Sequence, residues 1–476
     1  MKRRIAALLS DTHLRELLAH GVFNFGLRLG AGLLGFLFVV MLGRTLGPNG
    51  TGVYVLALAV ATVATVLSRL GMPGVLTRFV AAESQAGRWD RVRGVYRKAL
   101  LVSVVAAVTL TPLVIAGATG ARELGWMQPE VARAVRWMAL AILPVTVVWV
   151  TAGALFGLKA VRAATFVQVA MLHLIALPVF LLLASSGEAS PLDAVAGYVT
   201  AQTIAAVVGL LVWRRYRKPG PASFEWTALR RTAGPFFWVS TLMLADGWTA
   251  AFALGIWATP SEVGIYNAAL RMAMLTSYIL NAVNSIAAPK FAALHEAGDT
   301  RSLVRTAVGS SRFMTAVAAP LLLGFFLAPT WVMGLFGEGF EAGWIALVII
   351  AAGQFFNVAS GSVGSLLAMT GRERLLRNVT MVSVGTNVVL TLTLVPIFGV
   401  AGAACGTAIG WVLFNIGCAV MVRRRLGIWV HFFAPMPPAL PAHGDAAGAN
   451  AQSPSLTEPR PDPALDPRPP AVVDND

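Results

Sequence analysis

Long apolar runs dominate the chain, and short polar segments separate them. A helix that spans a bilayer needs about 20 consecutive, mostly apolar residues. By this measure the pattern predicts twelve spanning helices, at residues 21–42, 51–70, 99–118, 134–156, 163–184, 193–213, 233–257, 264–288, 313–331, 343–369, 376–398 and 400–422. The runs are too long for barrel strands and lack their alternation of apolar and polar positions. The pattern therefore predicts an all-α, polytopic membrane protein.

One stretch of the chain occurs a second time in its second half. The segment LGRTLGPNGTGVYVLAL, from Leu42, aligns without a gap with LGIWATPSEVGIYNAAL, from Leu254, at an offset of 212 residues. Seven pairs are identical: Leu42/Leu254, Gly43/Gly255, Pro48/Pro260, Gly52/Gly264, Tyr54/Tyr266, Ala57/Ala269 and Leu58/Leu270. A duplication this long, built of apolar segments, indicates a two-lobed membrane transporter.

The polar segments divide the chain into five predicted parts. An interfacial helix at 1–20 precedes an N-lobe at 21–213, a linker at 214–231, a C-lobe at 232–426 and a tail at 427–476. The linker combines Pro-Gly and Gly-Pro pairs with a basic run, which marks a boundary. The tail, from Pro435 on, holds 11 of the 26 prolines. Such a composition cannot bury a core, so we expect a disordered tail.

Composition independently places the chain in a membrane. Hydrophobic residues make up 57% of the sequence and charged residues only 12%, which leaves too little polar surface for a soluble protein of 476 residues. Cys405 and Cys418 lie thirteen positions apart in one predicted span, so they cannot bridge each other. We expect no disulfide framework, no thiol-based metal site and no cofactor.

Basic residues fall on alternate connections between the predicted spans. With the N-terminus inside, 31 of the 37 Lys and Arg residues lie in cytoplasmic segments; the other six are Arg28, Arg44, Arg122, Arg133, Arg136 and Arg271. Lys and Arg in short loops are retained on the cytoplasmic side, so both termini are predicted to be cytoplasmic. The net charge of +15 therefore reflects topology and does not require a nucleic-acid partner.

Several segments together resemble a known family over nearly all of residues 15–426. They are RTLGPNGTGVYVLALAV, LGMPGVLTRFVAAESQAGRWDRV, EVGIYNAALRMAML, AAPKFAALHEAGDTRSL, AMTGRERLLRN and FGVAGAACGTAI. These segments resemble the polysaccharide and oligosaccharide flippases of the multidrug/oligosaccharidyl-lipid/polysaccharide exporter superfamily. Some relatives, including the lipid II flippases, carry two further helices where this chain has a polar tail.

The resemblance implies a fold and an activity. The fold would be two homologous six-helix lobes around a central cavity. The activity would be translocation of a lipid-linked, polyprenyl-pyrophosphate oligosaccharide or polysaccharide precursor across the cytoplasmic membrane by alternating access, usually driven by an ion gradient. The implied partners are the sugar substrate, membrane lipid and polysaccharide-assembly proteins.

Asp246 is the acidic residue that the pattern places in the middle of a span, in STLMLADGWTAAF. A charge in hydrocarbon costs about 2.5–3.5 kcal/mol on insertion scales, so it needs a reason to be there. One interpretation is a protonatable or cation-binding carboxylate that faces an aqueous cavity and couples transport to an ion. The other is a packing carboxylate held by Asn, Ser, Trp or backbone partners.

Two arginines also fall inside predicted spans. Arg28 lies about seven residues from the cytoplasmic end of the first span, and Arg271 about seven residues from the outer end of the eighth. At 1.5 Å per residue each is roughly 10 Å from an interface, close enough for its side chain to snorkel. Alternatively, both face the cavity and bind pyrophosphate, which a guanidinium fits by bidentate hydrogen bonding. The resemblance favours this role, because the first and eighth helices line the cavity in the superfamily.

Uncharged polar residues add weaker candidates. Asn281 and Asn284 lie about one turn apart, so they share a face of the eighth span and are candidates for sugar contact. Other amides in spans are more readily explained as contacts between helices: Asn24, Gln354, Asn357, Asn387 and Asn415. His173 is interpreted as a neutral core histidine.

Two other classes of protein remain as alternatives. A membrane-embedded polysaccharide polymerase or ligase would need a sizeable outer loop for its chemistry, and the predicted outer connections are short. No phosphate-binding G-x-x-x-x-G-K-[ST] motif and no cluster of metal ligands occurs, so we predict no enzyme. A small-molecule or multidrug exporter of the same superfamily would share the fold and differ in the lining of the cavity. Two intramembrane arginines against one aspartate favour an anionic substrate.

Overall fold

The computed structural model describes the backbone of residues 12–436 and the side chains of residues 26, 27 and 29–436. Within this part of the chain all regular elements are helices. Nine helical stretches there are long and apolar enough to cross a membrane. The protein is therefore an all-α, polytopic membrane protein, as predicted.

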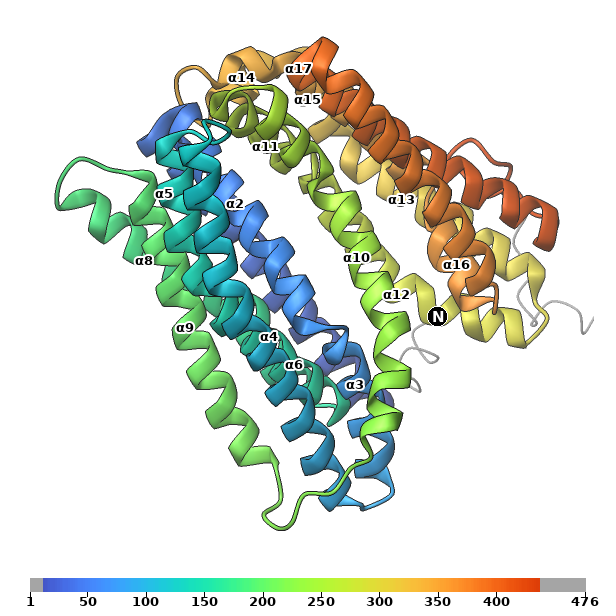
Figure 1. Cartoon of the computed structure of the whole chain (residues 1–476). Coiled ribbons are helices and arrows are strands. Elements are labelled where there is room, and N and C mark those ends of the chain that lie inside the picture. The colour runs from blue at the N-terminus through green and yellow to red at the C-terminus, as the bar shows by residue number, and fades with distance from the viewer. Residues whose placement is uncertain (1–11, 437–476) are drawn as a thin grey trace, which may run out of the picture. The chain divides into compact units, whose positions relative to one another are not determined.

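The helices follow the chain in two series. The first half contains α2 (Thr12–Arg69), α3 (Met72–Gln85), α4 (Trp89–Glu123), α5 (Pro129–Met138), η1 (Ala139–Ala141), α6 (Ile142–Gly157), α7 (Val161–Thr165), η2 (Phe166–Ala170), α8 (Met171–Ser185) and α9 (Pro191–Tyr216). The second half contains α10 (Trp226–Trp257), α11 (Pro260–Ala273), α12 (Leu275–Glu296), α13 (Thr300–Leu327), α14 (Pro329–Gly334), η3 (Phe340–Gly343), α15 (Trp344–Ala359), α16 (Val363–Met369) and α17 (Glu373–Leu426). Figure 1 shows α10 between the helices of the two halves.

Two of the long helices are each two predicted spans joined end to end. α2 breaks at Gly47, whose φ of 66° is left-handed, and Pro48 follows. α17 breaks at Gly399, with a φ of 52°. Glycine tolerates this conformation and the other residue types rarely do, which explains why both breaks fall on glycines. The predicted eighth span is interrupted as well, because α11 ends at Ala273 and α12 starts at Leu275.

The start of the chain differs in part from the prediction. Residues 12–20 belong to α2 and continue into the first predicted span without a break. Residues 1–11 lie outside the described residues, so the separate interfacial helix at 1–20 stays a prediction.

The repeated stretch of sequence forms the contact between the two halves. α2 packs along α11, and the two copies of the motif meet there. A Cβ on Gly52 would lie 1.6 Å from the carbonyl oxygen of Pro260, and a Cβ on Gly264 would lie 2.2 Å from the carbonyl oxygen of Pro48. Because Gly52 and Gly264 are equivalent in the repeat, the contact is reciprocal and requires glycine on both sides.

Replacing Gly52 with valine is expected to lower the melting temperature of the purified protein. The added side chain meets a backbone carbonyl that cannot rotate away, and overpacking of this kind typically costs about 1–3 kcal/mol or more. Gly117→Val is the matched control, because a Cβ at Gly117 in α4 meets nothing within 4 Å. Equal melting temperatures for the two variants would contradict the reciprocal glycine contact.

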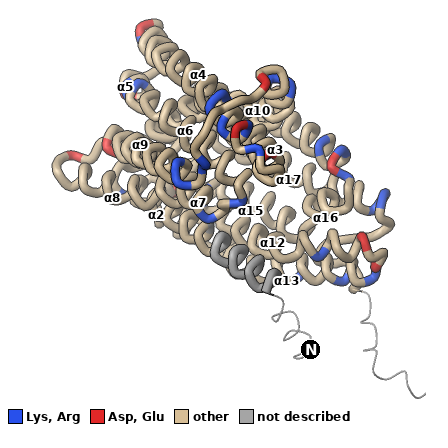
Figure 2. The backbone as a smooth tube through the Cα atoms, turned by 90° about the horizontal axis from the view of Figure 1, so that it is seen from below, with Lys and Arg blue, Asp and Glu red and all other residues tan. Residues whose placement is uncertain are grey.

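Large apolar side chains cover the outside of the helices. Leu113 on α4, Leu182 on α8, Met243 on α10 and Ile397 on α17 are each more than 60% exposed. In water such a surface would be unfavourable, but lipid tails are equally apolar. In Figure 2, Lys and Arg gather around α3 and α7, at connections that the charge pattern predicts to be cytoplasmic.

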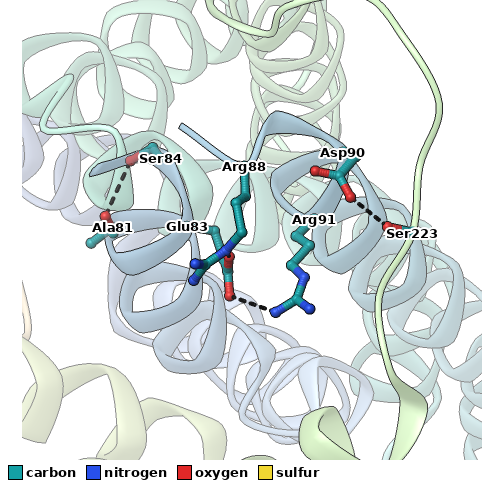
Figure 3. Close-up of polar contacts among 7 residues, drawn as sticks. All are labelled: Ala81, Glu83, Ser84, Arg88, Asp90, Arg91 and Ser223. Carbon is teal, nitrogen blue, oxygen red and sulfur yellow. Dashed lines mark hydrogen bonds and ion pairs between the residues drawn. The ribbon is translucent and has the colours of Figure 1, made fainter. Parts of the chain in front are cut away.

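The connection between α9 and α10 is bound to the first half of the chain. The Arg93 guanidinium donates hydrogen bonds to the carbonyl oxygens of Pro221 (2.6 Å) and Lys218 (2.8 Å). The Ser223 hydroxyl donates to an Asp90 carboxylate oxygen at 2.6 Å (Figure 3), which lowers the pKa of Asp90. Packing then continues into α10, since Leu229 and Ala233 belong to the same hydrophobic cluster as α3. The predicted boundary at residue 232 is therefore not a boundary in packing.

Glu83, at the end of α3, pairs with two arginines. It accepts a hydrogen bond from Arg88, and its other carboxylate oxygen lies 3.7 Å from Arg91 (Figure 3). The hydrogen bond to Glu83 raises the pKa of Arg88. These contacts fix the turn between α3 and α4 that faces the linker.

Residues 427–436, the first part of the predicted tail, pack against the helices. Ile428, Val430 and Ala434 are buried, and the amide of Phe432 donates to the carbonyl oxygen of Ala359 at 2.8 Å. Arg312 on α13 donates to the carbonyl oxygens of Phe432 and Ala434. Six of the seven residues in IWVHFFA are apolar, and this local run makes the docking possible, although the Pro-rich composition of the tail as a whole predicts no core. Residues 437–476 lie outside the described residues.

Candidate functional site

Two adjoining cavities lie inside the helical assembly. The larger, of about 970 Å³, lies between α2, α6 and α8 of the first half and α11 and α12 of the second, and we call it the inter-repeat cavity. The smaller, of about 280 Å³, lies among α2, α6, α8 and α9, and α10 and α11 complete its wall. We call it the N-half cavity. Gly35, Trp149, Gln168, His173 and Arg271 line both cavities, so the two adjoin at these residues.

Close approach of the helices around the cavities depends on two glycines of α2. A Cβ on Gly32 would lie 2.7 Å from the Tyr278 ring, and one on Gly35 would lie 2.9 Å from Nε2 of His173. Gly32 and Gly35 therefore allow Tyr278 and His173 to reach the walls of the inter-repeat cavity. His173 thus lines both cavities, and its predicted neutral state stays a prediction.

Arg271 lies where the two cavities adjoin. It occupies the last turn of α11, just before the interruption at Met274, and its side chain is exposed to the cavities that it lines. Among the side chains that the structure describes, the only salt bridges are those of Glu83 with Arg88 and Arg91. Arg271 therefore has no carboxylate partner in the described structure. Of the two interpretations of Arg271, the structure agrees with the one in which it faces a cavity.

Arg69 is a second cationic residue of the cavities, and the sequence pattern did not single it out. It is the last residue of α2, and the charge pattern places it in a predicted cytoplasmic connection. A side chain in a helix points back toward the helix N-terminus, and a long one at the last position therefore reaches into the membrane. Its guanidinium carbon lies 4.3 Å from the centre of the Trp149 ring, and its Nε donates to the carbonyl oxygen of Thr65 at 3.0 Å.

Asn281 and Asn284 both line the inter-repeat cavity, so they lie on one face of α12. Within the described residues the buried Oδ1 of Asn284 has no hydrogen-bond partner. A buried amide oxygen without a partner is costly unless water or a ligand binds it. Contact of Asn281 and Asn284 with sugar stays a prediction.

The position of Arg28 is only partly described. Its backbone lies in α2, and the next residue in the chain, Leu29, lines the inter-repeat cavity. The side chain of Arg28 lies outside the described residues, so its predicted contact with pyrophosphate stays a prediction.

Asp246 lies in the middle of α10 and interacts with α17. The Nδ2 of Asn387 donates to Oδ1 of Asp246 at 3.1 Å, and the Thr391 hydroxyl donates to Oδ1 of Asn387 at 3.1 Å. This chain of hydrogen bonds fixes the orientation of the Asn387 amide. Asp246 lines neither of the two cavities, whereas Trp248, two residues further on, lines the N-half cavity. The carboxylate thus has the Asn partner of the packing interpretation.

The surroundings of Asp246 offer further oxygen atoms. Thr407 on α17 shares a hydrogen bond of 2.8 Å with the Tyr266 hydroxyl. α17 folds tightly here, because a Cβ on Gly406 would lie 2.3 Å from the Thr391 hydroxyl oxygen. The Asp246 carboxylate itself suits a proton or a hard cation, and no softer ligand is present among these side chains.

The other intramembrane amides join helices, as predicted. Gln354 donates to the Ser277 hydroxyl at 3.0 Å, Asn357 donates to Gln354 at 3.0 Å, and Asn415 donates to Asn357 at 3.1 Å. Since Ser277 lines the inter-repeat cavity, this network connects the cavity wall on α12 to α15 and α17. Asn24 lies outside the described side chains.

Curated relatives match only part of the chain. It is 25% identical over 173 residues to the "Probable low-salt glycan biosynthesis flippase Agl15" of Haloferax volcanii. The aligned segment covers 36% of each protein. It is 23% identical over 184 residues to the "Probable flippase AglR" of the same organism, which covers 38% of each. The chain thus spans little more than a third of the length of these relatives.

Solved structures resemble the fold over most of its length. The lipid II flippase MurJ in an inward closed conformation has a TM-score of 0.68 at 11% identity, covering 84% of this chain and 87% of the other. An inward-facing multidrug resistance MATE family transporter has a TM-score of 0.65 at 15% identity, covering 85% and 98%. At this identity the likeness shows a shared fold alone.

A family model spans more than half of the sequence and includes the repeated motif, Arg69, Arg271 and both asparagines of the cavity wall. The model is described as "Polysaccharide biosynthesis protein" and matches residues 17–295. With its duplicated helices and the cavity between them, the chain belongs to the polysaccharide biosynthesis protein family.

Proposed function

We propose that this protein is a flippase that moves a lipid-linked oligosaccharide or polysaccharide precursor, carried on polyprenyl pyrophosphate, across the cytoplasmic membrane by alternating access. One observation carries the proposal. Arg271 lies in the wall of a cavity between the two halves of a duplicated membrane protein, and none of the described side chains provides a carboxylate partner for it. An unpaired cation inside a membrane is unfavourable, and a pyrophosphate would neutralise it. Translocation leaves the substrate chemically unchanged, so the proposed protein is a transporter and not an enzyme.

The size and lining of the inter-repeat cavity support such a substrate. A volume of about 970 Å³ is at the upper end of ligand pockets, which typically measure about 300–1,000 Å³. Arg271, Asn281 and Asn284 provide charged and amide groups for pyrophosphate and sugar hydroxyls. The names of the two Haloferax relatives and of the MurJ structure, all flippases, point in the same direction.

A multidrug exporter of the same superfamily is the alternative. An exporter of organic cations needs a negative or strongly aromatic cavity. None of the described residues that line the two cavities is Asp or Glu. The charge of the lining therefore favours the anionic lipid-linked sugar.

Coupling to an ion gradient is assigned to Asp246. The carboxylate, the Asn387 amide and the Thr391 and Thr407 hydroxyls lie on α10 and α17, and Asp246 lines neither of the cavities that Arg271 lines. Occupation by a proton or a cation would change the attraction between these helices, and such a differential interaction is required to shift a conformational equilibrium. The coupling site and the substrate site would then be separate, which allows each to be tested by itself.

The proposed orientation places both termini in the cytoplasm, where polysaccharide-assembly proteins could also bind. In a variant with Cys405 and Cys418 replaced by alanine, Glu188→Cys is expected to react with a membrane-impermeant maleimide in intact cells. Ala222→Cys and Glu296→Cys are expected to react only after permeabilisation. All three positions are exposed in the structure, so lack of access can be attributed to the membrane. The opposite labelling pattern would overturn the topology and the direction of transport.

Ligand competition tests the class of substrate. Purified protein in nanodiscs is titrated with farnesyl pyrophosphate and with tetraphenylphosphonium, an organic cation. We expect the pyrophosphate to bind and its affinity to fall with added salt, because the contact is electrostatic. Binding of tetraphenylphosphonium alone, without competition from farnesyl pyrophosphate, would favour the exporter instead.

A further inference from the structure

The N-half cavity has a lining that the pyrophosphate site does not explain. At about 280 Å³ it is too small for a polyprenyl chain and is comparable to the smallest ligand pockets. Its wall combines aromatic rings with neutral hydrogen-bonding groups: Tyr54, Trp149, Tyr198, Gln168, Gln202 and Asn267. A sugar ring has apolar C–H faces and hydroxyl groups at its edge, so it matches a wall of this kind.

Trp149 and Arg69 form one unit within this wall. The guanidinium stacks on the indole at 4.3 Å, while Trp149 remains 38% exposed and lines both cavities. The Nε of Arg69 is occupied by the Thr65 carbonyl. None of the described residues accepts a hydrogen bond from the terminal nitrogens of Arg69 or provides a carboxylate partner for them. They are therefore available as donors to a ligand in the N-half cavity.

The backbone near Gln168 is a second, independent indication of a binding site. Residues Phe166–Ala170 form a π-helical turn between α7 and α8. Such turns are rare and often occur at functional sites, because they reorient the residues that follow. Here the turn carries Gln168, which lines both cavities, and His173 follows within the next turn of helix.

We propose that the N-half cavity is a sugar subsite, which binds the sugar residue attached directly to the pyrophosphate, with Arg69 and Gln168 as residues that recognise it. This inference rests on the proposed flippase function. Arg271 lies where the two cavities adjoin, so a pyrophosphate held there has its sugar on one side and its lipid on the other. The N-half cavity fits the first sugar, and the larger inter-repeat cavity lies on the lipid side of the pyrophosphate.

The alternative role for Arg69 is a second contact with pyrophosphate. The rest of the N-half lining argues against that role, because its polar groups other than Arg69, Arg271 and His173 are neutral amides and hydroxyls, which lie among aromatic and aliphatic side chains. Neutral groups of this kind suit hydroxyl and amide substituents better than a doubly charged phosphate. Measuring the contribution of the sugar to the affinity separately from that of the pyrophosphate decides between these roles.

The experiment compares ligands with and without a sugar. The affinity of purified protein is measured for farnesyl pyrophosphate and for the same lipid bearing one glucose, galactose, N-acetylglucosamine or glucuronic acid. We expect at least one sugar to tighten binding about tenfold over the bare lipid, as one or two hydrogen bonds would. Arg69→Gln and, independently, Gln168→Ala are expected to remove this tightening and to change the affinity for the bare lipid much less.

The controls keep the outcomes distinct. Arg78→Gln changes an exposed arginine of α3 that lines neither cavity, and it should retain the sugar-dependent tightening. Gln168 has no hydrogen-bond partner in the described structure, so replacing it leaves no protein group unpaired. Size-exclusion profiles verify that each variant is folded. If no sugar tightens binding, or if the tightening survives both substitutions, the subsite is excluded. Equal weakening of all five ligands by Arg69→Gln would assign Arg69 to the pyrophosphate. Failure of the bare lipid to bind would instead contradict the proposed function itself.

Discussion

Replacing Arg271 with alanine is expected to lower the affinity for a polyprenyl pyrophosphate roughly ten- to a hundredfold and to remove most transport. A charge-assisted hydrogen bond contributes about 1.5–3 kcal/mol, which corresponds to a loss of affinity of this size. Arg271 has no carboxylate partner in the described structure, so alanine removes the contact with the ligand without leaving a buried anion behind. The affinity of purified protein and the amount of surface polysaccharide in cells measure the two effects.

Replacing Arg271 with lysine distinguishes recognition of the pyrophosphate from anchoring of the helix at the membrane interface. Lysine keeps the positive charge and can snorkel, but it lacks the planar fork that grips two phosphate oxygens. We therefore expect Arg271→Lys to retain part of the affinity and Arg271→Ala to retain very little. Arg133→Ala is the matched control, since Arg133 is exposed on α5 and lines neither cavity. If the Arg271→Ala protein binds the pyrophosphate as tightly as the parent, Arg271 does not recognise the ligand and its role is purely structural.

Replacing Asp246 with asparagine is expected to abolish gradient-driven transport while leaving insertion and substrate binding intact. The amide has nearly the same shape as the carboxylate, and it can still accept a hydrogen bond from Asn387. It cannot take up a proton or neutralise a cation, so the coupling ion loses its partner. Because Asp246 lines neither cavity, the affinity for farnesyl pyrophosphate should stay near that of the parent.

The measurement for Asp246 is uptake into proteoliposomes with and without an imposed ion gradient. Glu123→Gln is the control, because it removes one carboxylate at the exposed end of α4 and should transport normally. Gradient-driven transport by Asp246→Asn at the parental rate, with equal protein in the membrane, would remove Asp246 from the mechanism and leave it as a packing residue between α10 and α17.

The hydrophobic pattern predicted the helices well because the bilayer imposes one simple requirement on each span. Each of the twelve predicted spans lies mostly in helix, although α2 and α17 each contain two of them and the spans at 264–288, 313–331 and 343–369 are interrupted. The repeat at Leu42 and Leu254 also carried information about packing. Its glycines turned out to be the reciprocal contact of Gly52 and Gly264, where only a missing side chain lets the two backbones approach. The twelve-span, two-lobed topology in the membrane stays a prediction.

The residues that the sequence missed depend on contacts between distant segments. Arg69 reads as a loop residue until its side chain is seen to fold back onto Trp149, which lies 80 positions later. Docking of Gly427–Met436 likewise depends on Arg312 and Ala359, which no local composition reveals. Asp246 was found because a mid-span carboxylate is conspicuous, but its partner Asn387 is 141 positions away. Periodicity identifies buried faces, whereas pairings of this kind come only from the fold.

Flipping by the purified protein tests the central claim most directly. Proteoliposomes are prepared with a fluorescent polyprenyl-pyrophosphate oligosaccharide, and reagent access to the sugar reports its leaflet over time. We predict that the protein transfers the lipid-linked sugar between leaflets much faster than protein-free liposomes do, and that Arg271→Ala removes most of the difference. Transfer at the protein-free rate, in preparations that transport tetraphenylphosphonium, would contradict the account and identify an exporter of organic cations.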